Sequence, residues 1–367
     1  MENIKTGKYT EKEIVELFGS DSQKKSYEEN GRFVSKYKTS LFKKINKYCD
    51  ITELKEKENG RHLYEIKEVY KYPLPTSFPK MQKSLYKYIC PLILNYLIDN
   101  EYNEDRKIDI TVGKWSREIN MVNKNYNLVK YNKEDTAKET QYPIDLIYEF
   151  IDKTDDMLNH YITTALDYLK SAGLIIWRDV YRINVEVSDK ENITIDEKGE
   201  VSLPLHIESR QASKEDMQYY SECIEIADKA ANINNATERY YSKKSKRFND
   251  VLKRELYKRK IKCVYKTYEA YYIDLDKCKY ILNQFEYTDK KKLVKDFNDE
   301  FTNMILENAS KRFNKFPGKY LYCNGEDDYI VRQEGMCEMT IANETEYLGD
   351  RIKKSAIEDD YNLTIIK

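Results

Sequence analysis

The fold class is decided by residues 37–66, which read YKTSLFKKINKYCDITELKEKENGRHLYEI. In the first half of this stretch apolar side chains recur at spacings of four, four and three, which is the period of one helical face: Tyr37, Leu41, Ile45 and Tyr48. Asn59-Gly60 then supplies residues that tolerate the left-handed backbone of a two-residue turn, and alternating apolar residues flank it. The stretch predicts an amphipathic helix followed by a β-hairpin.

Another helix is expected before this stretch. Thr10 and Glu13 have the spacing of a capping box, in which each side chain bonds to the backbone N–H of the other, and a short helix to Phe18 follows. Helix, helix and hairpin in this order are typical of a winged helix, a small module that binds DNA.

The same order of elements recurs twice along the chain. A helix that Thr154 caps ends at Ala172-Gly173, and residues 174–187 alternate as strand material with Arg178-Asp179 as the expected wing turn. Between residues 237 and 275 a basic helix precedes two expected aromatic strands, and residues 123–141 are expected to form an exposed loop. We therefore predict a mainly α-helical chain with short β-hairpins, an α+β fold of tandem winged-helix modules with a helical C-terminal region.

The division of the chain follows from these elements, from three prolines and from charge. Pro73, Pro75 and Pro79 interrupt regular structure and indicate a linker. We expect an N-terminal winged-helix module at residues 1–70, a linker at 71–80, a second winged-helix module at 81–187, an acidic connection at 188–212, a basic helix, hairpin and helical region at 213–316, and an acidic segment at 317–367.

Composition excludes several classes of protein. The 367 residues are 40% hydrophobic and 35% charged, which is typical of a folded domain with a polar surface. No Gly-Lys pair has the spacing of a phosphate-binding P-loop, and the three histidines and seven cysteines show no metal-site spacing, so we expect no metal and no cofactor. The first residues, Met-Glu-Asn-Ile-Lys, contain no apolar signal core, and we expect a cytoplasmic protein without a membrane span.

Charge is strongly segregated although the net charge is −1. Residues 24–48 contain eight basic and two acidic side chains, and residues 238–266 contain twelve basic and three acidic side chains. Such segregation is typical of a surface that binds a polyanion.

Candidate DNA-binding residues are the basic and hydroxyl side chains of the three expected helices and their wings, because lysine and arginine contact phosphates while serine, threonine and arginine reach base edges. In the first module they are Lys36, Thr39, Ser40, Lys43, Lys44, Lys47 and Arg61. In the second they are His160, Thr163, Thr164, Arg178 and Arg182. In the third they are Lys243, Lys244, Lys246, Arg247, Lys253, Arg254, Lys258, Arg259 and Lys260.

Residues 8–187 resemble a known class of proteins. The early basic helix with the Asn59-Gly60 hairpin, and the later stretch ALDYLKSAGLI at 165–175, are similar to the helix and wing of tandem winged-helix replication initiators from plasmids and phages of low-GC Gram-positive bacteria. The resemblance implies binding to repeated sites in double-stranded DNA at an origin, recruitment of host replication proteins and no intrinsic catalysis. A second copy of the chain, in a homodimer, is a further candidate partner.

Two alternatives remain open. A transcriptional or partition regulator would use the same modules to read its DNA site. A metal-dependent nuclease or DNA-relaxing enzyme would need clustered carboxylates, and the two clusters in the sequence have no diagnostic spacing: Glu269 with Asp274 and Asp276, and Glu326-Asp327-Asp328. We expect a DNA-binding protein rather than an enzyme.

Overall fold

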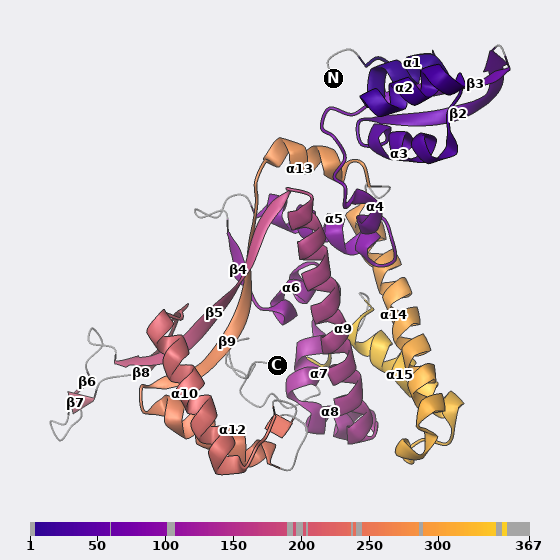
Figure 1. Cartoon of the computed structure of the whole chain (residues 1–367). Coiled ribbons are helices and arrows are strands. Elements are labelled where there is room, and N and C mark those ends of the chain that lie inside the picture. Colours follow the sequence, from indigo (N-terminus) through magenta and orange to yellow (C-terminus); the bar gives the residue numbers. More distant parts are fainter. Residues whose placement is uncertain are drawn as a thin grey trace. The chain divides into compact units, whose positions relative to one another are not determined.

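The computed structural model combines α-helices with antiparallel β-strands (Figure 1). It describes residues 4–58, 60–100, 107–188, 194–195, 201–202, 205–235, 238–239, 244–285, 289–342 and 347–350. Contacts between Cα atoms divide the chain into two compact units. Unit 1 comprises Met1–Tyr102, His160–Ile176 and Tyr272–Glu300, and unit 2 comprises Asn103–Asn159, Trp177–Tyr271 and Phe301–Lys367.

Unit 1 begins with three helices between a short strand and a hairpin. The elements are β1 (Gly7–Thr10), α1 (Glu11–Phe18), α2 (Asp21–Asn30), α3 (Ser35–Ile45), β2 (Cys49–Glu58) and β3 (Arg61–Val69). The sheet order is β1-β3-β2, and both strand pairs are antiparallel. The predicted capping box is confirmed, since the Glu13 N–H donates to Thr10 Oγ1 and the Thr10 N–H donates to Glu13 Oε2.

The predicted basic helix and hairpin are also confirmed within this N-terminal segment (residues 7–69). α3 buries Leu41 and Ile45 against α1 and the sheet, where Ile14, Phe18 and Tyr64 complete the core. Gly60 has a φ of +78°, the left-handed conformation that glycine adopts without steric cost, while Asn59 lies outside the described residues. The sequence missed α2 and the third strand, β1.

The rest of unit 1 is helical. α4 (Phe78–Met81) begins inside the expected linker, and α5 (Tyr86–Asp99) contains the buried Pro91. The C-terminal part of α9 (Ile144–Ser171), α13 (Leu275–Leu282) and the first residues of α14 (Lys290–Lys315) complete the unit. Aromatic contacts hold these helices together, for example Tyr86 of α5 with Tyr168 of α9 at 5.0 Å between ring centroids.

Unit 2 contains a four-stranded sheet in the order β4-β9-β5-β8, formed by β4 (Ile108–Ile110), β9 (Ile261–Tyr272), β5 (Ile175–Ser188) and β8 (Leu205–Gln211). The pairs β4–β9 and β5–β8 are antiparallel. α10 (Lys214–Ala231) and α12 (Ser245–Tyr257) pack together, and their apolar faces share one core with Ile183, Ile261 and Val264 of the strands.

The remaining elements of unit 2 are mostly short. They are α6 (Val112–Glu118), α7 (Asn125–Tyr131), α8 (Lys133–Thr140), β6 (Thr194–Ile195), β7 (Val201–Ser202), α15 (Glu326–Thr340), and the 3₁₀ turns η1 (Pro317–Lys319) and η2 (Leu348–Asp350). The helical C-terminal region is therefore confirmed, and α14 ends two residues before Pro317. No helix among the described residues has both the length and the apolar character needed to cross a bilayer.

Several sequence predictions are wrong. β5 continues through Arg178 and Asp179, so there is no wing turn there, because both side chains are ion-paired to β9 residues, Glu269 and Lys266. Residues 261–272 form one strand rather than two.

Sequence predictions for three helices are also wrong. Residues 123–141, expected to be an exposed loop, contain α7 and α8. Thr154 does not cap a helix, because α9 begins ten residues earlier, at Ile144, and Thr154 lies buried in its interior.

Candidate nucleic-acid interface

α3 presents one face of small and basic side chains to solvent. Lys36, Thr39, Ser40 and Lys43 are exposed, whereas Leu41 and Ile45 on the opposite face are buried. The hydroxyls of Thr39 and Ser40 are bonded within the helix, to the carbonyls of Ser35 at 3.2 Å and of Tyr37 at 3.0 Å. Lys36 and Lys43 have no ion-pair partner among the residues that the structure describes. This face can therefore contact phosphates without first breaking an ion pair.

Two other predicted lysines of this region are held by neighbouring groups. Lys44 Nζ donates to the carbonyl of Phe18 at 2.8 Å, at the C-terminus of α1. Lys47 Nζ donates to Thr76 Oγ1 at 3.1 Å. Both contacts lie inside unit 1, so these lysines connect its elements in the structure as it stands.

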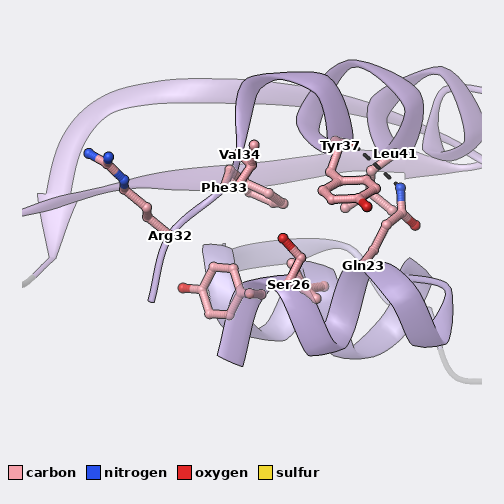
Figure 2. Close-up of a pocket in the computed structure, with 9 residues that line it drawn as sticks. Gln23, Ser26, Arg32, Phe33, Val34, Tyr37 and Leu41 are labelled. Atoms are coloured by element: carbon pink, nitrogen blue, oxygen red, sulfur yellow. Dashed lines mark hydrogen bonds between the residues drawn. The ribbon is translucent and has the colours of Figure 1, made fainter. Parts of the chain in front are cut away.

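α2 and α3 are positioned against each other by polar and apolar contacts. Gln23 Nε2 donates to Ser40 Oγ at 3.0 Å and lies 3.4 Å from the Tyr37 carbonyl. Figure 2 shows Gln23 and Ser26 of α2 facing Tyr37 and Leu41 of α3 across a small cavity. Because its walls also include the apolar Val15 and Val34, we interpret this cavity as a packing gap between the two helices. The contacts of Gln23 with α3 fix the angle between them.

Arg61, predicted at the wing tip, lies across the end of α2. Its Nη1 donates to the Tyr27 hydroxyl at 3.1 Å, and its guanidinium carbon is 5.9 Å from the centroid of the Tyr27 ring. Burial raises the pKa of Tyr27, while the positive charge of Arg61 acts in the opposite direction. The contact fixes the start of β3 against α2.

A groove beside this contact contains residues that the sequence analysis missed. Its lining includes Glu11, Asn30, Arg32, Lys38, Arg61 and His62. Arg32 is exposed, and Lys38 Nζ donates to Glu53 at 2.8 Å while lying 5.5 Å from the centroid of the Tyr64 ring. The excess of basic residues between positions 24 and 48 was the sequence signal that could have identified Arg32. This signal does not distinguish Arg32 from nearby cations, such as Lys38, that are held in ion pairs.

The residues predicted for the second module fall into both units. His160, Thr163 and Thr164 lie on α9 in unit 1, where the Thr163 hydroxyl donates to the His160 carbonyl at 3.1 Å and Thr164 hydrogen-bonds to Tyr86. Arg178 and Arg182 lie on β5 in unit 2, paired to Glu269 at 2.9 Å and Asp109 at 2.7 Å. Both arginines connect neighbouring elements, β9 and β4, to β5.

The residues predicted for the third module lie on and after α12. Lys246, Arg247 and Lys253 are exposed and have no ion-pair partner within the described part of the chain. Arg254 and Lys258 both pair with Glu255, the guanidinium at 3.5 Å.

The flanking cations of this group are held differently. Lys244 pairs with Glu238 at 2.9 Å. Arg259 lies 3.9 Å from the Tyr219 ring centroid, and Lys260 is exposed in the left-handed backbone conformation. Lys243 lies outside the described residues.

Four of the six carboxylates considered for a nuclease have structural partners. Glu269 is buried and bonded to Arg178, and Asp274 caps α13 by accepting from the Lys277 N–H at 2.9 Å. Glu326 accepts from Ser310, and Asp328 from Arg332. Among the residues that the structure describes, His, Cys, Asp and Glu side chains form no group of three or more suited to a metal ion.

Comparisons of the chain with models of protein families, with curated proteins and with solved structures gave no match.

Proposed function

We propose that the chain reads specific sites in double-stranded DNA with its N-terminal segment, as a winged helix, and that it serves as a plasmid or phage replication initiator. The observation that carries this proposal is the exposed face of α3, next to the β2–β3 hairpin. On this face Lys36 and Lys43, which have no ion-pair partner among the described residues, flank two hydroxyl side chains. A helix of this kind fits the major groove, which is about 12 Å wide.

Each part of the segment has a role in this proposal. Lys36 and Lys43 contact phosphates, and Thr39 and Ser40 reach base edges, since hydroxyl groups both donate and accept hydrogen bonds. The hairpin lies along the neighbouring backbone, and Gln23 and Lys44 keep α3 at the angle that insertion requires. The second set of predicted residues is not part of this proposal, because Arg178 and Arg182 are engaged in ion pairs within the sheet.

The initiator role rests on the resemblance described above. As an initiator, the protein would bind repeated sites at an origin, recruit host replication proteins and act in the cytoplasm. A transcriptional or partition regulator would bind DNA with the same face of α3, and only a replication assay separates these roles.

The first experiment is a fluorescence-anisotropy titration of the whole chain against duplexes tiled from the DNA that flanks its gene, with random duplex as reference. We expect one repeated tile to bind more than about tenfold tighter than random DNA, because site-reading proteins exceed this ratio widely. Placing that tile on a marked replicon then separates an initiator from a regulator. If no tile exceeds random DNA tenfold, site-specific recognition is wrong.

A pair of variants tests the assignment of α3. In Lys36→Gln/Lys43→Gln the slope of log affinity against log salt should fall in magnitude by about 1.8, at about 0.9 per phosphate contact. The matched control is Lys83→Gln/Lys279→Gln, which removes two exposed lysines of unit 1 outside the N-terminal segment. Equal slopes for both variants would remove α3 from the interface.

A further inference from the structure

α10 and α12 form a helix pair in unit 2 (Figure 1), and the outer face of α12 is the more basic of the two. The exposed face of α12 contains Lys246, Arg247, Lys253, Arg254, Tyr257 and Lys258, which we call the α12 surface. Lys246, Lys253 and Tyr257 are spaced by seven and four residues, so they form one row about 16 Å long at 1.5 Å per residue. Asp250 is exposed on the same face.

The exposed side chains of α10 are of both signs instead, since Lys214 and Lys229 are exposed on this helix as well as three glutamates. Glu215, Glu222 and Glu225 are exposed there. The two helices meet through their apolar sides, where Cys223 and Ala227 pack in one core with Phe248 and Leu252. Because the acids of α10 lie on a separate face, they leave Lys246, Arg247 and Lys253 without an ion-pair partner in the described part of the chain. A polyanion would be attracted more strongly along α12 than along α10.

The residue types on the α12 surface indicate how such a polyanion is recognised. Apart from Asp250, its charged side chains are lysine and arginine, the groups that contact phosphates. Ser245 and Asn249, whose side-chain types commonly read bases, are half-buried. Binding there should therefore depend little on base sequence.

One aromatic ring is exposed at the end of this row. Tyr257 is 53% exposed, and Lys262 Nζ lies 5.0 Å from its ring centroid. Lys262 also pairs with Glu186, so the cation beside the ring is held in place from the strand side. An exposed ring among cations is a platform on which an unpaired base stacks, and this contact is open to single strands because their bases are not buried in a duplex.

We propose that the α12 surface binds single-stranded nucleic acid without sequence preference, with Lys246, Arg247 and Lys253 on the phosphates and Tyr257 stacked on a base. This site is separate from the α3 face, shares no residue with it, and holds whether or not the N-terminal segment reads a duplex site.

The test measures binding of the whole chain to fluorescein-labelled dT20 and rU20 by anisotropy. Tyr257→Ala should weaken binding at least about fivefold, since one stacked base contributes about 1–3 kcal/mol, whereas Tyr257→Phe should keep it. Lys246→Gln/Lys253→Gln should reduce the salt slope by about 1.4, at about 0.7 per contact for a single strand. Comparison of the affinities for dT20 and rU20 shows whether the site prefers single-stranded DNA or single-stranded RNA.

The matched control is Lys214→Gln/Lys229→Gln, which removes two exposed lysines from α10 and should leave the slope unchanged. Unchanged melting temperatures confirm that each variant is folded, as expected for exposed positions. The proposal would be overturned if Tyr257→Ala left the affinity unchanged. It would also be overturned if the control variant reduced the salt slope as much as Lys246→Gln/Lys253→Gln does. Lys36→Gln/Lys43→Gln should bind dT20 as the wild type does, so failure of the duplex proposal is recognised independently.

Discussion

Lys43 and Lys44 are adjacent on α3, yet we predict that replacing each one by glutamine changes a different property. Lys43 is exposed and has no ion-pair partner among the described residues, whereas Lys44 Nζ donates to the Phe18 carbonyl at the end of α1. A lysine at a helix C-terminus is stabilising because it binds carbonyls that lack an intrahelical partner and interacts with the helix dipole.

The magnitudes follow from these contacts. Since Lys44 is exposed to solvent, its charged hydrogen bond and its dipole interaction together should contribute about 1 kcal/mol. Lys44→Gln should therefore speed amide exchange in the last turn of α1 by about fivefold. Lys43→Gln should leave amide exchange unchanged but lower the magnitude of the duplex salt slope by about 0.9. Between about 50 and 200 mM salt, the affinity of this variant should therefore fall about 3.5-fold less than that of the wild type.

The assays are hydrogen exchange on the free protein and anisotropy on a duplex at several salt concentrations. Lys44→Arg is the control, because it keeps a charged donor and should restore slow exchange. The reasoning is refuted if Lys44→Gln lowers the salt slope by as much as Lys43→Gln and leaves exchange of the Val15–Phe18 amides unchanged.

Three further predictions concern stability. Arg210 donates to Asp216 at 2.7 and 3.1 Å and holds the pKa of that carboxyl at about 2, so Arg210→Gln should raise this pKa toward the ordinary 3.8 in an NMR titration of the carboxyl carbon. Because the pKa is lowered in the folded protein, the pair stabilises the fold above about pH 4 and loses that contribution as the pH falls toward 2. Gly31→Ala should cost about 1 kcal/mol by urea unfolding, since Gly31 ends α2 with a φ of +63°. Leu41→Ala should cost about 2–5 kcal/mol in the same assay, because Leu41 is 1% exposed in the core of the N-terminal segment, and a smaller loss would mean that this core collapses around the missing side chain.

The capping box, the basic helix and the hairpin of the N-terminal segment could be predicted because their signals are local. Thr10 and Glu13 are three residues apart, and Gly60 sets the hairpin turn within the hairpin itself. Such contacts are specified by residues that are neighbours in sequence, so spacing is enough to find them.

The strands of unit 2 could not be predicted in the same way. β9 pairs with β4, where Ala270 lies opposite Ile108, more than 150 residues away. Alternation marks residues 174–187 as strand material but does not give the partner, and the cross-strand pairs that identify Arg178 and Asp179 as mid-strand residues involve Glu269 and Lys266. From the sequence alone, the dipeptide Arg178-Asp179 was therefore wrongly predicted to form a turn.

The candidate site shows the same limit for individual side chains. Helical spacing places Lys43 and Lys44 together on the outside of α3, although the carbonyl that binds Lys44 belongs to Phe18. On α12, Glu255 lies among the cations and pairs with Arg254 and Lys258. Charge counts along the sequence therefore overestimate the number of cations available to a polyanion.

This smaller number constrains how the duplex is bound. Lys36 and Lys43 of α3 would together give a salt slope of only about −1.8, whereas proteins with six to ten phosphate contacts have slopes several times steeper. One copy of α3 is therefore too weakly charged to hold a site by itself at physiological salt. The hairpin, Arg32 or a second copy on a neighbouring repeat has to supply the remaining contacts. A slope that doubles when a tile contains two repeats instead of one would identify the second copy, and a steep slope on a single repeat would assign the contacts to the segment itself.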